Sequence, residues 1–302
     1  MRIAILARPN RKNGAERLLQ AAKKRGHKAQ IIDYTECYCN IEKDNQQIYY
    51  EGKPLPHFDA IIPRIAIESQ SYGSVIIRQF EMTNTFTTTG SLAFIRARDK
   101  LRSMQLLARA GIDIPKTVVA RQTRDVAGLI EAVGGTPLII KVARGSQGVG
   151  VVLAETRKAA RSIIQAFYSQ NVNILVQEFI AEANGEDIRV FIVDGEVVAA
   201  MKRKTLDEDE FRSNINLGGV GEPVELTPKE KRVALKAAKT MHLPIAGVDI
   251  LRAKRGPLVM EVNAFPMLNG IEAATKIDIA DEIIRYVERS VGVKPKLDKV
   301  GV

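Results

Sequence analysis

Residues 244–272 read PIAGVDILRAKRGPLVMEVNAFPMLNGIE, and this stretch decides which fold the chain adopts. Two apolar runs, Ala246 to Leu251 and Leu258 to Val262, are joined by a polar Arg-Ala-Lys-Arg-Gly turn. Short apolar runs on either side of a polar turn with a glycine predict a β-hairpin. Each run contains one carboxylate, so the predicted hairpin carries acids among its apolar residues.

Three oxygen-bearing side chains are predicted to converge on this hairpin. Alternation along a strand sends Glu261 and Asn263 to one face, where Asp249 of the partner strand can meet them. A carboxylate inside an apolar strand is costly unless positive charge lies against it, and Mg²⁺ prefers an all-oxygen ligand set. We interpret the trio as a candidate Mg²⁺–nucleotide site. The alternative is that Asp249 and Glu261 pair with surrounding arginines and lysines.

A glycine-rich loop upstream supports the nucleotide interpretation. Residues 137–153 read PLIIKVARGSQGVGVVL, with Gly145, Gly148 and Gly150 between two β-type runs. Phosphate-binding loops of the P-loop and Rossmann types lead into a helix, so they are disfavoured. The pattern predicts a hairpin lid whose backbone amides approach an anion, with Lys141 as a point charge on the phosphates. The alternative is a loose solvent loop.

Composition and charge indicate a globular protein with an anionic partner. The 302 residues are 45% hydrophobic and 26% charged, which suits two or three subdomains. A formal charge of +10 fits nucleotide, acidic peptide or RNA. Because the basic residues are spread along the chain and Trp is absent, no direct nucleic-acid recognition is expected.

Neither a zinc site nor a membrane segment is predicted. Cys37 and Cys39 supply at most half a zinc site, and no further Cys or His cluster completes it, so two reduced thiols are expected. The first ten residues, MRIAILARPN, hold too short an apolar run for a secretory signal. No apolar segment approaches the ~20 residues of a membrane helix. A cytoplasmic location is therefore expected.

Residues 1–95 predict an α/β subdomain. A strand from Arg2 to Ala7, a helix from Ala15 to Arg25 and a strand from Ala29 to Asp33 form a βαβ unit with a parallel sheet. The turn after the first strand lacks G-x-G-x-x-G, which argues against a dinucleotide-binding domain. We expect this subdomain to be a scaffold, with Arg64 a candidate contact for an acidic substrate.

The middle of the chain predicts a nucleotide-binding edge followed by a hairpin. Exposed backbone at Glu178 and Phe179 is a candidate edge for adenine, and the Glu178 or Asp187 carboxylate can accept from ribose hydroxyls. The Asp194-Gly195 pair predicts a two-residue hairpin turn. Arg189 lies in the strand before this turn and is expected to face a neighbouring strand.

Helix caps and turns suggest where the chain divides. Asp99 caps one predicted helix, Thr227 and Glu230 form a capping box, and Asp278 caps the last helix. We expect boundaries near residues 96 and 175, with a first subdomain at 1–95, lobes at 96–175 and 176–290, and a tail at 291–302.

The ordered set of motifs resembles an ATP-grasp ligase, a fold that mixes α/β and α+β parts. In such ligases two α+β lobes, preceded here by the N-terminal α/β subdomain, hold Mg²⁺-ATP between them. The closer resemblance is to the RimK-type glutamate ligases. It is carried by these segments: PHFDAIIPRI (56–65), RQFEM (78–82), ARDKLRSMQLLARAGI (97–112), VVLAETR (151–157), FRSN (211–214), AGVDILR (246–252) and GPLVMEVNA (256–264).

The resemblance implies roles for individual residues. The ATP-binding residues would be Lys100, Lys141, Gly145, Ser146, Gly148, Gly150, Glu178, Phe179, Asp187, Arg212, Ser213 and Asn214. Two Mg²⁺ or Mn²⁺ ions would be held by Asp249, Glu261 and Asn263. Substrate contacts would come from Arg64, Arg189, Arg203 and Asn216, and the catalytic residues would be Lys141, Arg203 and Arg212.

The implied reaction joins a carboxylate to the amine of L-glutamate. The carboxylate attacks the γ-phosphorus of ATP, and the amine then displaces phosphate from the acyl-phosphate through a tetrahedral intermediate, whose oxyanion Arg203 and Arg212 would stabilise. In the RimK-like group the acceptor is the carboxyl terminus of an acidic protein or peptide, typically a small-subunit ribosomal protein, and glutamates are added in succession as poly-α-glutamate. A homo-oligomer, a tetramer, is also implied.

One segment departs from the family pattern. Where the family usually has Ala-Ser-Pro-Gly-x-x-Gly-Ile-Glu, residues 264–272 read AFPMLNGIE, with Phe265 and Met267 at the altered positions. The residues expected to bind ATP keep the family pattern. The changes at Phe265 and Met267 would instead alter the preference for the amino acid or lower the activity. The alternatives are therefore a ligase for another amino acid or for a cofactor or carrier-protein acceptor, and a catalytically silent, nucleotide-dependent binder of ribosomes or RNA.

Overall fold

The chain divides into two compact units. The computed structural model describes residues 1–9, 14–43, 45–142, 150–205 and 219–292. Unit 1 comprises Met1–Ile95, Met267–Asn269 and the residues from Asp278 on, whereas unit 2 comprises Arg96–Pro266 and Gly270–Ile277. In the described part of the chain, no helix has the length and apolar character needed to cross a membrane.

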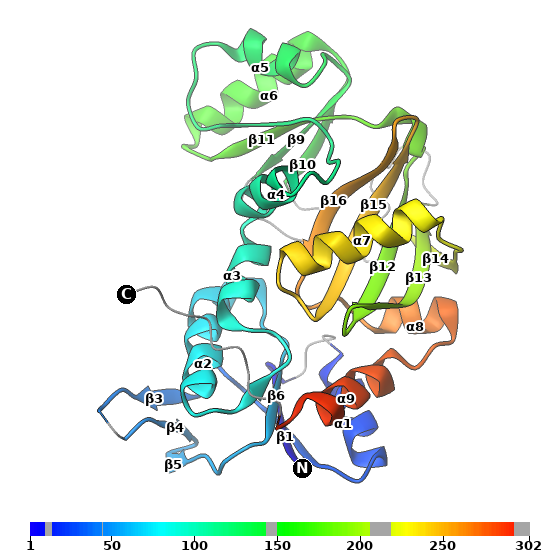
Figure 1. Ribbon diagram of the computed structural model, residues 1–302. Coiled ribbons are helices and arrows are strands. Elements are labelled where there is room, and N and C mark those ends of the chain that lie inside the picture. The colour runs from blue at the N-terminus through cyan, green and yellow to red at the C-terminus, as the bar shows by residue number, and fades with distance from the viewer. Residues whose placement is uncertain (10–13, 44, 143–149, 206–218, 293–302) are drawn as a thin grey trace. The chain divides into compact units, whose positions relative to one another are not determined.

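Unit 1 is built on a four-stranded sheet of order β2-β1-β6-β7 (Figure 1). Its strands are β1 (Arg2–Leu6), β2 (Lys28–Ile32), β6 (Ala60–Pro63) and β7 (Phe86–Thr87). All three pairings are parallel, so the predicted βαβ unit with its crossover helix α1 (Ala15–Lys24) is confirmed. The strands β1 and β6 are almost wholly buried and form the core of this unit.

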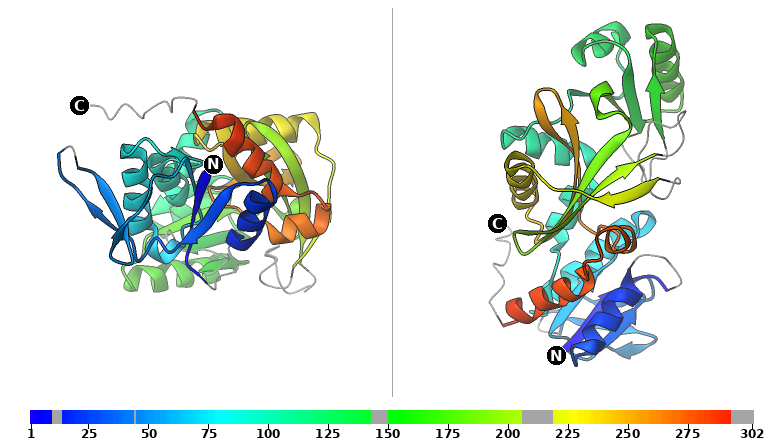
Figure 2. Two further views of the ribbon diagram at one scale, coloured as in Figure 1. Left: turned by 90° about the horizontal axis from the view of Figure 1, so that it is seen from below. Right: turned by 90° about the vertical axis from the view of Figure 1, so that its right-hand side faces the viewer.

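Helices and a small antiparallel sheet complete unit 1. The remaining elements are β3 (Tyr38–Asn40), β4 (Gln47–Tyr50), β5 (Lys53–Pro54), the short 3₁₀ helix η1 (Ile67–Ser69), α2 (Gln70–Met82), α9 (Ile279–Ser290) and α3 (Ser91–Arg98), which runs on into unit 2. Strands β4 and β5 pair antiparallel on either side of the Glu51-Gly52 turn. Helix α9, from the far end of the chain, packs beside α1 (Figure 2).

The first sheet of unit 2 has the order β10-β9-β11-β8 and is antiparallel throughout. Its elements are β8 (Thr117–Ala120), α5 (Val126–Ala132), β9 (Leu138–Val142), β10 (Val151–Ala154), α6 (Arg157–Ser169) and β11 (Ile174–Glu178). Apolar residues of α5 and α6 pack with those of the sheet in one core. Strands β9 and β10 pair on either side of the glycine-rich segment, which confirms the predicted β-type flanks.

The second sheet of unit 2 has the order β14-β13-β12-β15-β16. The elements of this part are α4 (Lys100–Arg109), the 3₁₀ helix η2 (Ala181–Ala183), β12 (Glu186–Val193), β13 (Glu196–Lys204), β14 (Val220–Pro223), α7 (Pro228–Thr240), β15 (Ile245–Ala253), β16 (Gly256–Asn263) and α8 (Asn269–Thr275). The predicted hairpins β12–β13 and β15–β16 are both present, and the predicted capping box begins α7.

Helix α7 covers one face of this second sheet. On that face Arg252 Nε donates to Glu230 Oε1 at 2.7 Å. Because Arg252 is three residues after Asp249 on β15, the side chain of Asp249 points to the opposite face. The predicted acids therefore lie on the face that α7 leaves free.

Candidate active site

Two β-bulges align the polar residues on that free face. Counting back from the Ala253–Gly256 pair at the turn would place Asp249 opposite Met260, but the register shifts next to Asp249 and Glu261 becomes its partner. A shift between Phe191 and Ile192 works in the same way in the β12–β13 hairpin. A one-residue shift moves a side chain to the other face of a sheet. The bulges thus bring the charged residues of four strands to one face.

Asp249 is the centre of this cluster. It is only 2% exposed, and both of its oxygens accept hydrogen bonds from Arg189, at 2.7 Å from Nε and 2.6 Å from Nη2. Arg203 Nη2 lies 3.0 Å from Asp249 Oδ2. Burial by itself would raise the pKa of Asp249, but the two guanidinium groups hold it below its ordinary value. For Asp249, pairing with surrounding arginines is therefore what the structure shows.

Arg203 links Asp249 to a second buried acid. Its Nε and Nη2 donate to the two oxygens of Asp187 at 2.6 and 2.7 Å. Burial alone would lower the pKa of Arg203, but Asp249 and Asp187 hold it above its ordinary value. A bidentate ion pair of this kind fixes the orientation of both side chains as well as pairing their charges. Arg203 and Arg189 thus both reach the cluster, and the Asp187 carboxylate, expected at the ribose, is bound to Arg203.

Asn263 and Glu261 complete the predicted metal trio. With the Asn263 amide oriented so that both of its polar atoms are satisfied, its nitrogen donates to Glu261 Oε1 at 3.2 Å and its oxygen accepts from Arg189 Nη2 at 3.3 Å. The described residues include no group of three His, Cys, Asp or Glu side chains placed for a metal, so a metal bound here would need the Asn263 amide as its third ligand. The set fits a hard divalent cation, since carboxylate oxygens with free lone pairs can be shared with one.

Lys141 faces this cluster from strand β9. Its Nζ donates to Gln177 Oε1 at 2.8 Å. Burial lowers the pKa of Lys141 to about 8, with Lys100 adding to this effect and the negative charge of Glu261 opposing it. Lys100, Lys141, Gln177 and Glu261 all line a small cavity of about 40 Å³. The structure therefore brings both predicted phosphate-binding lysines together with one predicted metal ligand.

Gln177 is a residue that sequence reasoning missed. It is 3% exposed, and its amide nitrogen donates to Thr117 Oγ1 at 2.8 Å while its oxygen binds Lys141. The signal was available in the alternation of β11, where a polar residue stands among buried apolar neighbours. Its role is to hold the lysine ammonium in place.

Glu178 ends strand β11 and is tied to two other segments. Its carboxylate accepts from the Lys116 backbone N–H at 2.7 Å and forms an ion pair with Arg255 at the β15–β16 turn. Phe179 follows directly, at the end of the strand. The Glu178 side chain is thus engaged within the protein, and the backbone at Glu178 and Phe179 remains the proposed edge for adenine.

The other expected site residues divide into three groups. Arg64 belongs to unit 1 and is 5% exposed. Gly150 begins the second flank of the glycine loop with φ of 75°, a left-handed conformation that favours glycine. The rest lie outside the described residues: Gly145, Ser146, Gly148, Arg212, Ser213, Asn214 and Asn216.

Comparison with family models decides the family. Residues 97–287 match the model of the RimK-like ATP-grasp domain, and residues 1–94 match that of the RimK pre-ATP-grasp domain. The chain belongs to the RimK-like ATP-grasp family. It is an ATP-dependent ligase that forms carbon–nitrogen bonds, as the resemblance in the sequence implied.

Named relatives agree with this assignment. The ribosomal protein bS6–L-glutamate ligase of Escherichia coli O7:K1 is 54% identical over 289 residues, which are 96% of each chain. A probable α-L-glutamate ligase of Citrobacter koseri is 53% identical over the same length.

The solved structure of the ATP-grasp ligase PsnB, complexed with Mg and ADP, matches with a TM-score of 0.73 at 18% identity, covering 95% of this chain and 97% of that one. The predicted ATP-grasp fold is confirmed.

Proposed function

We propose that this ligase adds L-glutamate to the C-terminal carboxylate of an acidic ribosomal protein or of its growing poly-α-glutamate tail. The observation that carries the proposal is the cluster on one sheet face, where Asp249 and Glu261 lie opposite each other with Asn263, Arg189 and Arg203 around them. The high identity to ligases named for a ribosomal protein supports the acceptor.

The proposed cofactors are ATP and two Mg²⁺ or Mn²⁺ ions. Asp249, Glu261 and Asn263 would hold the ions, which when bound would neutralise charge on the transferred phosphoryl group. Lys100 and Lys141 line one cavity with Glu261. They would supply positive charge to the phosphates in addition to that of the ions. Cation and metal ligands without a serine or cysteine nucleophile suit phosphoryl transfer, where positioning and charge neutralisation carry catalysis.

The two arginines of the cluster are proposed to serve the acyl-transfer half. Arg203 is 6% exposed and oriented by two carboxylates, so its guanidinium is held rigidly enough to stabilise an oxyanion. Arg189 lies beside it and would bind a substrate carboxylate. Arg212, Ser213, Asn214 and Asn216 are proposed to complete the site from outside the described residues.

Product analysis tests the proposal. Incubation with ATP, Mg²⁺, L-glutamate and an acidic peptide should lengthen the peptide by glutamyl units, measured by mass spectrometry. The variants Asp249→Asn and Glu261→Gln should each lose at least about two orders of magnitude in rate while keeping the fold, because each removes a ligand charge. Glu196→Gln, a matched change at an exposed position of the same sheet, should leave the rate unchanged. Full activity in both site variants would reject the metal assignment.

The altered segment after Asn263 keeps open a preference for a different amino acid. Arg98 lies over the ring of Phe265 with its Cζ 5.8 Å from the ring centroid, a cation–π geometry that a serine at this position would not provide. A panel of amino acids in the same assay tests this alternative. Turnover with another amino acid but none with glutamate would replace the proposed substrate.

A further inference from the structure

Helix α7 carries a one-sided row of positive charge. Its buried face consists of Ala234, Ala237, Ala238 and the carboxylate Glu230, which binds Arg252. Every other charged residue of the helix is basic and exposed: Lys229, Lys231, Arg232, Lys236 and Lys239. The outer face of α7 therefore has no exposed acid to balance it.

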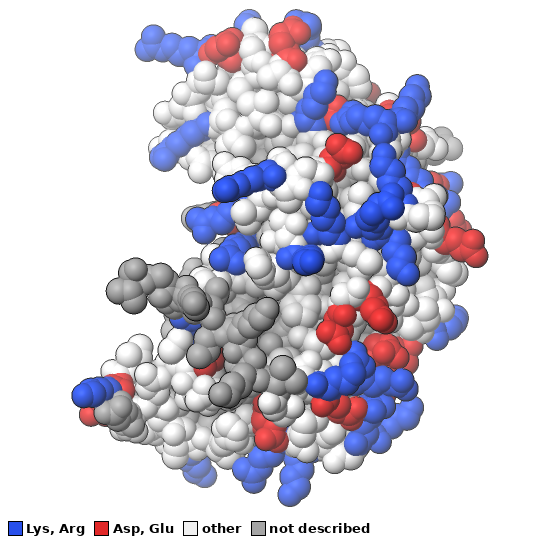
Figure 3. Space-filling model, viewed as in Figure 1, with Lys and Arg blue, Asp and Glu red and all other residues white. Residues whose placement is uncertain are grey.

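The outer bases of α7 contrast with the many arginines of the protein that lie against a carboxylate, and they are gathered on one helix face. Many exposed or half-exposed arginines are in ion pairs with carboxylates: Arg17, Arg25, Arg78, Arg102, Arg157, Arg252, Arg255 and Arg285. Among the described residues, none of the five outer bases of α7 lies in an ion pair. Figure 3 shows blue side chains gathered over the position of α7.

Four of the five bases form a straight stripe. Lys229, Arg232, Lys236 and Lys239 are spaced by three, four and three residues, which at 100° per residue places them within an arc of about 80° and along about 15 Å of helix. Lys236 Nζ donates to the backbone oxygen of Gly111 at 3.2 Å, so the middle of the stripe is anchored. A rigid row of unpaired cations matches a regularly charged polyanion.

The position of the stripe separates two kinds of anionic partner. The Asp249 cluster lies on the opposite face of the sheet from α7, as the contact of Arg252 with Glu230 shows. A short acidic tail whose end is held at Asp249 would have to pass around the sheet to reach the stripe. A larger anionic surface on the ribosome that carries the acceptor protein would not have to pass around the sheet.

We infer that the outer face of α7 binds the phosphate backbone of RNA, without reading its bases. The inference rests on the proposed function, since a ribosomal acceptor presents RNA as its largest anionic surface. The stripe contains no aromatic residue for base stacking, so binding through phosphates alone is expected. The dispersal of basic residues along the whole chain predicted no nucleic-acid recognition, but the α7 helix gathers five of them on one face.

The test is RNA binding by the full chain at several salt concentrations. The probe is a fluorescently labelled RNA duplex of about 20 base pairs, titrated between about 50 and 300 mM KCl. The variant Lys229→Gln, Arg232→Gln, Lys236→Gln, Lys239→Gln should reduce the slope of log affinity against log salt by about one per residue changed. Its control removes the same charge elsewhere: Lys23→Gln, Lys24→Gln, Lys158→Gln, Arg161→Gln, all at exposed positions of α1 and α6.

Each outcome decides the inference. A reduced slope in the α7 variant and an unchanged slope in the control support it. Equal slopes in both variants, or binding of a poly-glutamate peptide but not of RNA at the stripe, overturn it. Glutamate addition to a free acidic peptide should proceed at the same rate in all three proteins. If it fails in all three, the proposed function fails, whereas the RNA titration still decides the role of α7.

Discussion

At the scale of single residues, Lys141 is held where its charge is easily lost. Burial lowers its pKa to about 8, and its Nζ donates a hydrogen bond to the neutral amide of Gln177. A bound triphosphate would favour the charged form, so nucleotide binding should take up a proton when the pH exceeds about 8. Nucleotide affinity should therefore weaken by about tenfold between pH 7 and pH 9.

Calorimetric titration with Mg²⁺-ADP in buffers of different ionisation enthalpy measures both the affinity and the proton uptake. The variant Lys141→Met should bind more weakly and lose the dependence on pH in this interval. An affinity of the wild-type protein that stays constant from pH 7 to pH 9 would contradict the role of Lys141 as a phosphate-binding cation.

The sequence predicted which residues meet but not how they pair. Alternation placed Glu261 and Asn263 on one face, but Asp249 joins that face only through the bulge in β15–β16. The pairing of Asp187 with Arg203 depends on the bulge in β12–β13, because simple counting from Asp194-Gly195 would place Lys202 opposite Asp187. Bulges arise from packing across several strands, and no local pattern in the sequence reports them.

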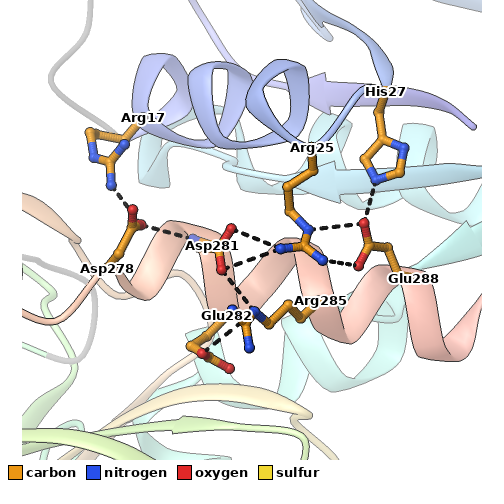
Figure 4. Close-up of polar contacts among 8 residues, drawn as sticks. All are labelled: Arg17, Arg25, His27, Asp278, Asp281, Glu282, Arg285 and Glu288. Atoms are coloured by element: carbon orange, nitrogen blue, oxygen red, sulfur yellow. Dashed lines mark hydrogen bonds and ion pairs between the residues drawn. The ribbon is translucent and has the colours of Figure 1, made fainter.

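At the scale of elements, α9 is bound to the N-terminal α/β sheet by charge as well as by apolar contact (Figure 4). Arg25, just after α1, donates from Nε and Nη2 to the two oxygens of Glu288 at 2.9 and 2.7 Å, and it also reaches Asp281. His27 Nε2 lies 2.8 Å from Glu288 Oε1. Glu288 therefore serves two partners from one position on α9.

The variant Glu288→Gln should destabilise unit 1 by about 1 kcal/mol at pH 7, a modest value because the pair is partly exposed to solvent. The hydrogen bond from Arg25 lowers the pKa of Glu288 to about 2, so its stabilisation is complete above pH 4.5 and lost as the pH falls toward 2. Thermal unfolding should show a wild-type advantage at pH 7 that shrinks steadily in acid. An advantage that persists unchanged at the lowest pH would show that charge is not its source.

Elements whose signals are local were predicted well. The Asp99 and Asp278 caps, the Thr227–Glu230 capping box and the Asp194-Gly195 turn all occur as expected, because each depends on contacts within four residues. Helix α2 has no side-chain cap at its start and begins at Gln70, because the preceding 3₁₀ turn leads directly into it. Ends of elements without a cap residue are the least determined by local sequence.

At the scale of the whole molecule, the chain returns to its beginning. Residues from Asp278 on are grouped with Met1–Ile95 in unit 1. No periodicity or motif predicts that α9 contacts α1, because the two segments are separated by most of the chain and no local pattern reports a pairing over that distance. The expected division at residue 175 and the expected tail at 291–302 stay predictions.

This arrangement means that the N-terminal sheet should depend on the end of the chain. Helix α9 buries Ile279, Ile283, Ile284 and Val287, and the ring of Tyr286 meets that of Phe86 on β7 edge to face at 5.8 Å between centroids. A chain ending at Ile277 should therefore expose the apolar face of α1 and bind the dye ANS. Unit 1 of this shortened chain should also unfold at a lower temperature than in the full chain. A chain ending at Gly292 is the matched control, because it removes only residues after α9 and should melt like the full chain. If both shortened chains melt alike and neither binds ANS, unit 1 does not need α9, and the burial of its four aliphatic side chains contributes little to the stability of the sheet.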